Sequence, residues 1–364
     1  MSAKRPEPRA GLLAIDAYVP GKSGSDYRGP VHKLSSNETP LGPPISAREA
    51  YEAASRSLEL YPDGSARLLR EAIAAQYGLD PLRVVCGHGS DDLLHLLAAA
   101  YIAPGDEGIL TAHGFQIFKI AILSAGGKAV CAPERQFKAA VDDILACVTE
   151  KTRIIFLANP NNPTGTYLEY SEVVRLADRI PRDVVLVLDG AYAEYVTAQD
   201  YSAGLALASE RPNVVVTRTF SKIFGLASLR VGWAYAPEHI CAVLHRIRGP
   251  FNVSGPALAA ATSAVRDQDH VARSIAHNDK WRGWLTERLT EIGLVVTPSA
   301  ANFVLVHLPA ASGRDASHAE SFLSREGVIV RGLRSYDLPN ALRITIGDQA
   351  ANEAVYEGLK KFMS

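Results

Sequence analysis

The stretch Val214-Val-Val-Thr-Arg-Thr-Phe-Ser-Lys-Ile-Phe-Gly-Leu-Ala-Ser-Leu-Arg-Val-Gly-Trp233 combines a strand with a group of reactive side chains. The β-branched run at 214–217 predicts a buried strand. The polar turn after it, and the segment beyond the turn, carry Thr219, Ser221, Lys222 and Arg230. A lysine amine can condense with an aldehyde, while hydroxyl groups and a guanidinium can hold a phosphate dianion. The alternative is a surface turn beside a structural arginine, and this stretch alone does not decide between the two.

Size and composition are those of an ordinary globular protein. The chain has 364 residues, 47% of them hydrophobic and 21% charged, which allows a main domain and a smaller one. The formal net charge of -1 offers no basic surface for nucleic acid or an anionic membrane. The four cysteines lie far apart, which favours a reducing compartment over disulfides or a metal site. We therefore expect a cytoplasmic protein with no nucleic-acid partner, no membrane partner and no bound metal.

Predicted strands and helices alternate through the middle of the chain. Helices are expected at 47–58 and 66–77. Strands are expected at 83–86, 108–111, 129–132, 153–158, 184–189 and 214–217, with helices between most of them. This alternation is typical of an α/β fold with a mostly parallel sheet that helices cover on both faces.

The C-terminal part has a different pattern. A long helix at 269–292 could link two domains. Beyond it, the expected strands are 301–308, 328–331 and 342–346, and the expected helices are 316–326 and 350–362. We therefore expect an N-terminal arm (1–45) that contributes to the small domain, a large domain (46–275), and a small α+β domain (276–364).

Three more polar motifs follow predicted strands, at the end where open α/β sheets bind their ligands. The first is Gly87-His-Gly-Ser-Asp91, in which the backbone N–H groups of Ser90 and Asp91 can bind a phosphate at a helix start. A dinucleotide fingerprint is a rival interpretation, but Asp92 stands where its third glycine would be. A second rival interpretation is that Ser90 only caps the helix.

The second and third motifs carry an amide, a carboxylate and a phenol. Asn162 belongs to the loop Asn159-Pro-Asn-Asn-Pro-Thr-Gly165, which two prolines and a glycine constrain. Asp189 ends an apolar strand, where an unpaired carboxylate is costly, and a protonated pyridine nitrogen would be a suitable partner. Tyr192 comes three positions later and could reach a ring hydroxyl. Turn chemistry and helix capping are the simpler explanations for these residues.

One ligand accounts for all four motifs together. Pyridoxal 5'-phosphate carries a phosphate, a ring hydroxyl, a pyridine nitrogen and an aldehyde on a single ring, so each motif has a partner. Coincidence is the weaker explanation, and we expect pyridoxal phosphate as the cofactor.

On these residues the chain resembles the pyridoxal-phosphate-dependent aminotransferases of fold type I. The matching segments are Asn162-Pro-Thr-Gly165, Asp189-x-x-Tyr192, Ser221-Lys222 and Arg230. More narrowly, it resembles the histidinol-phosphate aminotransferase family. The segments of that narrower match are Lys33-Leu-Ser-Ser-Asn-Glu-Thr-Pro-Leu-Gly42, Tyr61-Pro-Asp-Gly64, Thr219-Phe-Ser-Lys-Ile-Phe-Gly225 and Leu342-Arg-Ile-Thr-Ile-Gly347. The resemblance covers nearly the whole chain.

The resemblance implies a role for each matching side chain. Lys222 would bind the aldehyde carbon of the cofactor and later carry a proton to and from the substrate. Asp189 would pair with the ring nitrogen, and Tyr192 and Asn162 would hold the ring oxygen. The remaining contacts, to the phosphate or to the face of the ring, would come from Ser90, Asp91, Phe115, Thr219, Ser221 and Arg230.

The resemblance also implies a homodimer, in which Tyr61 reaches the phosphate of the neighbouring subunit. Arg343 matches the arginine that binds the acidic end of the substrate. Further substrate-binding candidates are Arg331, Tyr18 and Asn37. For Arg331 and Tyr18 a purely structural role is the alternative, and for Arg343 the alternative, which the motif disfavours, is a structural ion pair. Phe115 takes the position of the aromatic residue that stacks on the pyridine ring, and Phe118, three positions later, is expected in the core.

The implied reaction converts L-histidinol phosphate and 2-oxoglutarate to imidazole acetol phosphate and L-glutamate, in histidine biosynthesis. The nearest alternative is an aromatic or prephenate-type aminotransferase, or an enzyme with both specificities; a phosphothreonine decarboxylase is another. A nicotinamide dehydrogenase is disfavoured by the broken glycine fingerprint and by Lys222. A non-catalytic relative is disfavoured because Lys222, Asp189 and Arg230 are all present.

Overall fold

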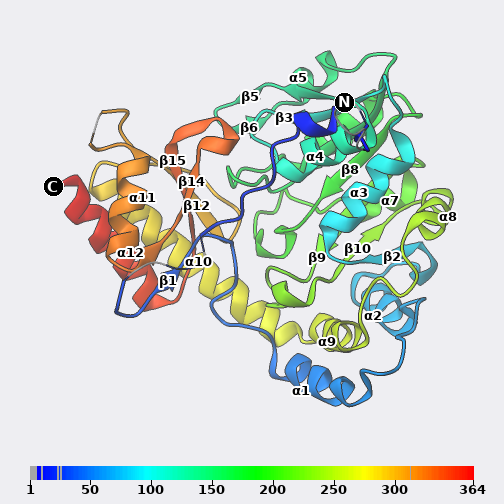
Figure 1. Ribbon diagram of the computed structural model, residues 1–364, viewed down its shortest axis with the longest axis horizontal. Helices are drawn as coiled ribbons and strands as arrows, with labels where there is room; N and C mark the ends of the chain where they lie inside the picture. The colour runs from blue at the N-terminus through cyan, green and yellow to red at the C-terminus, as the bar shows by residue number, and fades with distance from the viewer. Residues whose placement is uncertain (1–5, 10, 23, 25–26, 312) are drawn as a thin grey trace, which may run out of the picture.

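The structure is a computed structural model that describes residues 6–9, 11–22, 24, 27–311 and 313–364, with two main sheets of different size (Figure 1). The larger sheet has seven strands in the order β2-β10-β9-β8-β7-β3-β4. Their bounds are β2 (Val84–Gly87), β3 (Glu107–Thr111), β4 (Lys128–Ala132), β7 (Thr152–Ala158), β8 (Val185–Asp189), β9 (Val214–Thr219) and β10 (Gly232–Tyr235). Only β10 among them runs antiparallel to its neighbours.

Helices cover both faces of this sheet. Alternation along β8 puts Leu186 and Leu188 in one buried cluster and Val185 and Val187 in another. The first cluster includes residues of α2 (Arg67–Tyr77), α6 (Tyr170–Arg179) and α9 (Gly255–Arg266), and the second includes residues of α3 (Ser90–Tyr101), α4 (Gln116–Ala125) and α8 (Glu238–Ile247). Because both faces are buried, the central strands are almost continuously apolar.

The smaller sheet has four antiparallel strands in the order β11-β12-β15-β14. Their bounds are β11 (Val295–Thr297), β12 (Phe303–His307), β14 (Arg331–Leu333) and β15 (Leu338–Thr345). A buried cluster joins this sheet to the long helix α10 (Gln268–Glu291), to α11 (Ala316–Arg325) and to α12 (Gln349–Met363). The N-terminal arm adds β1 (His32–Lys33), which pairs in parallel with β13 (Val328–Ile329). The arm therefore crosses the small α+β unit before it enters α1 (Ile45–Ala54).

Short elements complete the chain. The remaining helices are α5 (Val141–Ala146) and α7 (Leu205–Glu210), and β5 (Glu134–Arg135) with β6 (Lys138–Ala139) forms a hairpin. The 3-10 turns are η1 (Leu12–Ala14), η2 (Ser55–Ser57), η3 (Pro81–Arg83), η4 (Ala193–Tyr195), η5 (Ala227–Leu229) and η6 (Arg334–Tyr336). In the described part of the chain, no helix combines the length and apolar character needed to cross a membrane.

The expected fold class, a mostly parallel α/β sheet with a smaller α+β unit, is confirmed. Two local expectations were wrong. The first helix ends at Ala54 and continues as η2, rather than running to residue 58. The expected strand 328–331 is two strands, because β13 pairs with the arm and β14 pairs with β15. The strand β10 and the β5–β6 hairpin were not expected from the sequence.

Candidate active site

Most predicted site residues line one cavity at the carboxyl ends of the large-sheet strands. This cavity measures about 190 Å³. The predicted residues that line it are Tyr18, Asn37, Ser90, Asp91, Phe115, Asn162, Asp189, Tyr192, Thr219, Ser221, Lys222, Arg230 and Arg343. A larger cavity of about 670 Å³ lies between α1, α2 and α9 and shares no lining residue with it. Chemistry rather than size therefore identifies the candidate site.

Lys222 follows β9 and lies partly buried in the cavity. Its Nζ donates a hydrogen bond to the backbone carbonyl of Ser36, at 3.2 Å. Burial, followed by the positive charge of Arg343, lowers the pKa of Lys222 to about 8. An amine with a lowered pKa is a better nucleophile and proton carrier near neutral pH.

Asp189 ends β8 with its carboxylate deep in the cavity. The side chain is 3% exposed, and Thr217 Oγ1 donates to its Oδ1 at 2.8 Å. Burial raises the pKa of Asp189 to about 7, although the Thr217 hydrogen bond acts in the opposite direction. A cation placed against this carboxylate would offset the cost of its burial. The protonated nitrogen of a pyridine ring meets that need, so the residue fits the expected cofactor.

The start of α3 and the turn before β10 form a cradle for an anion. Arg230 Nη1 donates to Ser221 Oγ at 3.1 Å, and its Nη2 lies 3.3 Å from Asp91 Oδ2. A Cβ atom at Gly89 would lie 2.6 Å from Arg230, and one at Gly232 would lie 2.3 Å from the backbone nitrogen of Ser90. Glycine at both positions therefore keeps N–H groups and guanidinium close together, an arrangement that suits a phosphate dianion.

Thr219 and Arg230 also shape the backbone around the anion cradle. The hydroxyl of Thr219 accepts a hydrogen bond from the backbone N–H of Ser221 at 3.1 Å, which fixes the turn just before Lys222. Arg230 adopts the left-handed conformation with φ 52°, which is strained for a residue with a side chain. This strained backbone conformation occurs at the residue whose guanidinium points into the anion cradle.

Asn37 makes contacts that differ from those expected of a substrate ligand. Its Nδ2 donates to Tyr192 Oη at 2.9 Å, and its backbone N–H donates to Thr345 Oγ1 at 2.9 Å. Asn302 Nδ2 donates to the backbone carbonyl of Asn37 at 3.0 Å. Asn37 is 1% exposed and left-handed, with φ 56°. The side chain thus orients the phenol of Tyr192, whose pKa burial raises above its ordinary value.

Arg343 of β15 reaches across to the large sheet. Its Nη1 donates to Asn162 Oδ1 at 2.6 Å and its Nη2 donates to the carbonyl of Ser35 at 2.7 Å. Its Nε has no partner among the described residues, and the side chain is 6% exposed. Both partners are neutral, so the guanidinium keeps a net charge inside the cavity. An acidic group of a substrate would supply the missing counter-charge.

Two predicted residues lie away from the cavity. Arg331 pairs with Arg343 across β14 and β15, but its Nη2 donates to the backbone carbonyl of Val19 and it does not line the cavity. Tyr61 is 84% exposed and stacks on Phe251, with ring centroids 4.7 Å apart. Neither residue contacts the cavity of its own chain.

The aromatic candidates fall as the sequence suggested. Phe115 lines the cavity, while Phe118 is buried and stacks on Phe156 with ring centroids 5.1 Å apart. Sequence reasoning missed several neighbours of the site, namely Ser35, Ser36, Ala191, Thr217, Asn302 and Thr345. A hydroxyl two residues before Thr219, on the same side of a buried strand, could have pointed to Thr217.

The buried lysine predicts a pH dependence of stability in the cofactor-free protein. The folded-state pKa is lowered from 10.5 to about 8, so the unfolded chain binds more protons between those values. The free energy of unfolding should therefore rise with pH across that window, by up to about 3 kcal/mol more than in Lys222→Met. Urea titrations from pH 7 to 10.5 measure it, with the exposed Lys119→Met as the control. Equal slopes in wild type and Lys222→Met would contradict the burial of a charged amine.

Known proteins resemble this chain over its full length. The family model for aminotransferase class I and II matches residues 30–359. The histidinol-phosphate aminotransferases of Nitrobacter winogradskyi and Rhodopseudomonas palustris are 52% and 53% identical over 361 residues, which is 99% of this chain and of each relative. The crystal structure of histidinol-phosphate aminotransferase from Sinorhizobium meliloti in complex with pyridoxal-5'-phosphate superposes with a TM-score of 0.88 at 27% identity, covering 100% of this chain and 98% of that one.

Proposed function

The chain belongs to the class I and II aminotransferase family, and from that premise we propose that it is a histidinol-phosphate aminotransferase of histidine biosynthesis. It transfers the amino group of L-histidinol phosphate to 2-oxoglutarate and yields imidazole acetol phosphate and L-glutamate. The observation that carries this function is Arg343, a buried guanidinium without an acidic partner in the cavity that holds Lys222. Both substrates end in an acidic group, so one arginine can bind each of them in turn.

The cofactor is pyridoxal 5'-phosphate, which the donor set of the cavity fits. When bound, it supplies an aldehyde carbon that takes up the amino group and a ring that withdraws electrons from the neighbouring carbon. Ser90, Ser221 and Arg230 would hold its phosphate. Asp189 would keep a proton on the ring nitrogen.

The remaining steps belong to side chains of the cavity. Tyr192 keeps its own proton, because its pKa is raised, and donates it in a hydrogen bond to the ring oxygen, with Asn162 beside it. The Lys222 amine would take a proton from the substrate Cα and deliver it to the former aldehyde carbon, on the other side of the transferred nitrogen. Such a positioned transfer contributes about 10²- to 10⁴-fold in rate. Arg343 fixes the acidic end of the substrate and so orients the Cα–H bond toward Lys222.

A single-turnover experiment tests this function. The cofactor-loaded enzyme is mixed separately with L-histidinol phosphate, L-phenylalanine and L-phosphothreonine, and the keto or decarboxylated product is measured by mass spectrometry. We expect one equivalent of imidazole acetol phosphate, formed at least about tenfold faster than phenylpyruvate. Comparable rates would favour a dual-specificity enzyme, and loss of carbon dioxide from phosphothreonine would favour the decarboxylase. No product from any of them would refute the substrate assignment.

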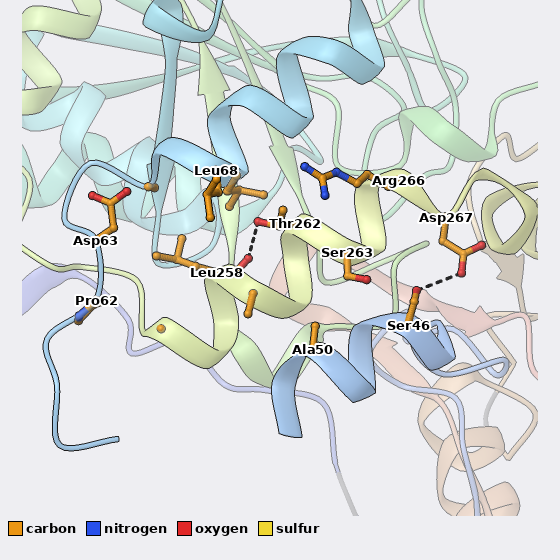
Figure 2. Close-up of a pocket in the computed structure, with 14 residues that line it drawn as sticks. Ser46, Ala50, Pro62, Asp63, Leu68, Leu258, Thr262, Ser263, Arg266 and Asp267 are labelled. Carbon is orange, nitrogen blue, oxygen red and sulfur yellow. Dashed lines mark hydrogen bonds between the residues drawn. The ribbon is translucent and has the colours of Figure 1, made fainter. Parts of the chain in front are cut away.

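We also propose that the enzyme is a homodimer, formed through the face of α1, α2 and α9. This face carries exposed apolar side chains, among them Tyr61, Leu68 (57% exposed) and Phe251 (44% exposed). Figure 2 shows Leu68 and Leu258 lining the wide hollow between these helices. Exposed apolar surface of this extent is typical of a protein interface. A second copy would bury it and bring Tyr61 toward the partner's phosphate cradle.

A charged substitution in this face is expected to separate the subunits. Leu68→Glu would place a carboxylate in an apolar contact, so light scattering after gel filtration should give a monomer, against a dimer for wild type. Val295→Glu on β11 is the matched control, because Val295 is 67% exposed but lies on the small sheet. A monomeric wild type, or a dimeric Leu68→Glu, would argue against this interface.

The division of the chain and its location complete the proposal. We keep the arm at 1–45, the large domain at 46–275 and the small domain at 276–364, so that α10 spans the second boundary. The cytoplasm is the proposed location, because all four cysteines are free, as is usual in a reducing compartment.

A further inference from the structure

The β5–β6 hairpin contains a turn that its sequence does not favour. Gln136 and Phe137 form its two-residue connection, and both are left-handed, with φ 51° and 63°. Such turns normally use Asn-Gly or Asp-Gly, because other side chains are strained at positive φ. A bulky phenylalanine in this conformation persists only where its surroundings hold it in place.

The base of this hairpin is fixed to the large-sheet side of the active site. The Glu134 carboxylate accepts a hydrogen bond from the backbone N–H of His113 at 3.2 Å and lies 2.9 Å from His113 Nδ1. Thr166 Oγ1 donates to the backbone carbonyl of Phe137 at 2.7 Å. Asn161 Nδ2 donates to the carbonyl of His113 at 3.3 Å. The hairpin is therefore tied to the loop that carries Asn162.

The ring of Phe137 packs against the other part of the molecule. It contacts a buried cluster that belongs entirely to the small sheet and its connections, made of Leu305, Leu333, Tyr336, Leu338 and Ala341. Its centroid lies 4.7 Å from the His307 ring and 5.9 Å from the His113 ring. The ring thus joins a histidine of the large-sheet side to one of the small sheet.

The surface beneath this ring is the same face of the small sheet that carries Arg343. Along β15, Ala341 and Arg343 are two residues apart and point to the same side. Across the sheet, His307 pairs with Ala341, and Leu305 pairs with Arg343. Phe137 therefore packs against a part of the sheet that includes Ala341, two residues or roughly 7 Å along β15 from the backbone of Arg343.

Resting on the proposed function, we propose that Phe137 is a positioning residue that sets the Arg343-bearing face of the small sheet over the cavity. Its carbonyl is tied to the Asn162 loop and its ring to the small sheet. Asn162 in turn accepts a hydrogen bond from Arg343. These contacts form a closed frame, in which the Phe137 ring fixes the distance at which an acidic substrate group meets Arg343. Phe137 itself touches neither substrate nor cofactor.

Phe137→Asn tests this role without damaging the hairpin, because asparagine tolerates the left-handed conformation. We expect the KM values for histidinol phosphate and 2-oxoglutarate both to rise about tenfold, with kcat within about threefold of wild type. The dissociation constant of pyridoxal phosphate should stay within about twofold. In the cofactor-free protein, amide hydrogen exchange in β15 should become about tenfold faster.

Two further variants separate positioning from general stability. Gln136→Gly relaxes the neighbouring strain and keeps the ring, so its KM values and β15 exchange should match wild type. Phe137→Leu keeps an apolar contact and should recover most of the loss. KM values within twofold of wild type in Phe137→Asn, together with unchanged exchange, would overturn the proposal. If the wild type does not turn over histidinol phosphate, the proposed function fails, and the substrate-free exchange comparison decides for or against Phe137.

Discussion

Replacing Lys222 with alanine is expected to lower turnover of histidinol phosphate by at least about 10³-fold. In the proposed mechanism, the variant loses both the amine that would bind the cofactor aldehyde and the group that would carry the Cα proton. Ser36 offers only a backbone carbonyl at the amine, so it cannot replace the lost base. Single-turnover product formation, compared at equal occupancy of pyridoxal phosphate, measures the effect.

The fold should survive this change. Among the described residues, the partly buried Lys222 amine donates to the carbonyl of Ser36, and removing its charge takes away a cost of desolvation. We expect Lys222→Ala to melt no lower than wild type in the cofactor-free state. Lys119→Ala, on the exposed side of α4, should keep wild-type turnover. A Lys222→Ala enzyme that retains more than a tenth of the rate would exclude Lys222 as the proton carrier.

The large sheet and the cofactor shell could be predicted from the sequence because local patterns determine them. β8 is a continuous apolar run, and β9 begins with three valines. Asp189 ends β8 and Lys222 follows β9 by three residues, so both must lie at one edge of a parallel sheet. The strand β10 was missed because it has only four residues and follows a turn whose left-handed Arg230 has no sequence signature.

The substrate side of the cavity could not be predicted in the same way. Asn37 lines the cavity as expected of a substrate-binding candidate, but its hydrogen bonds to Thr345, which is 308 positions away in the chain, and to Tyr192 were not foreseen. Arg331 was another substrate-binding candidate, yet its guanidinium is directed to the carbonyl of Val19 on the arm. These contacts depend on how the arm and the two sheets pack together, and no local pattern reports that packing.

Three separate segments meet at Arg343, which explains why its environment is not apparent from any one motif. The arm supplies the carbonyl of Ser35, the large sheet supplies the amide of Asn162, and the small sheet supplies the arginine itself. All three are buried or nearly so, and the arginine has no carboxylate partner in the described chain. Selectivity for acidic substrates is thus a property of the assembled fold.

Asp189→Asn is expected to reduce kcat/KM by about 10²- to 10³-fold while leaving the fold intact. The amide has nearly the shape of the carboxylate and can still accept the hydrogen bond of Thr217. It cannot, however, stabilise a positive charge on the ring nitrogen, and the ring then withdraws electrons less effectively from the reacting carbon. Steady-state kinetics and the dissociation constant of pyridoxal phosphate, which should rise, together measure the loss.

Thr217→Val separates the charge of Asp189 from its orientation. This variant removes the hydrogen bond at 2.8 Å but keeps the carboxylate, so we expect at most about a tenfold loss in kcat/KM.

Removing that bond should also raise the pKa of Asp189 above about 7 in the cofactor-free protein, because the bond acts to lower it. The free energy of unfolding of wild type, relative to Asp189→Asn, should fall as pH rises from 4 to 7, since the folded carboxyl holds its proton to a higher pH than the unfolded one.

Two kinetic outcomes would contradict this account of Asp189. If Thr217→Val were as impaired as Asp189→Asn, the position of the carboxylate rather than its charge would limit the reaction. If Asp189→Asn kept wild-type kcat/KM, the ring nitrogen would need no charged partner here.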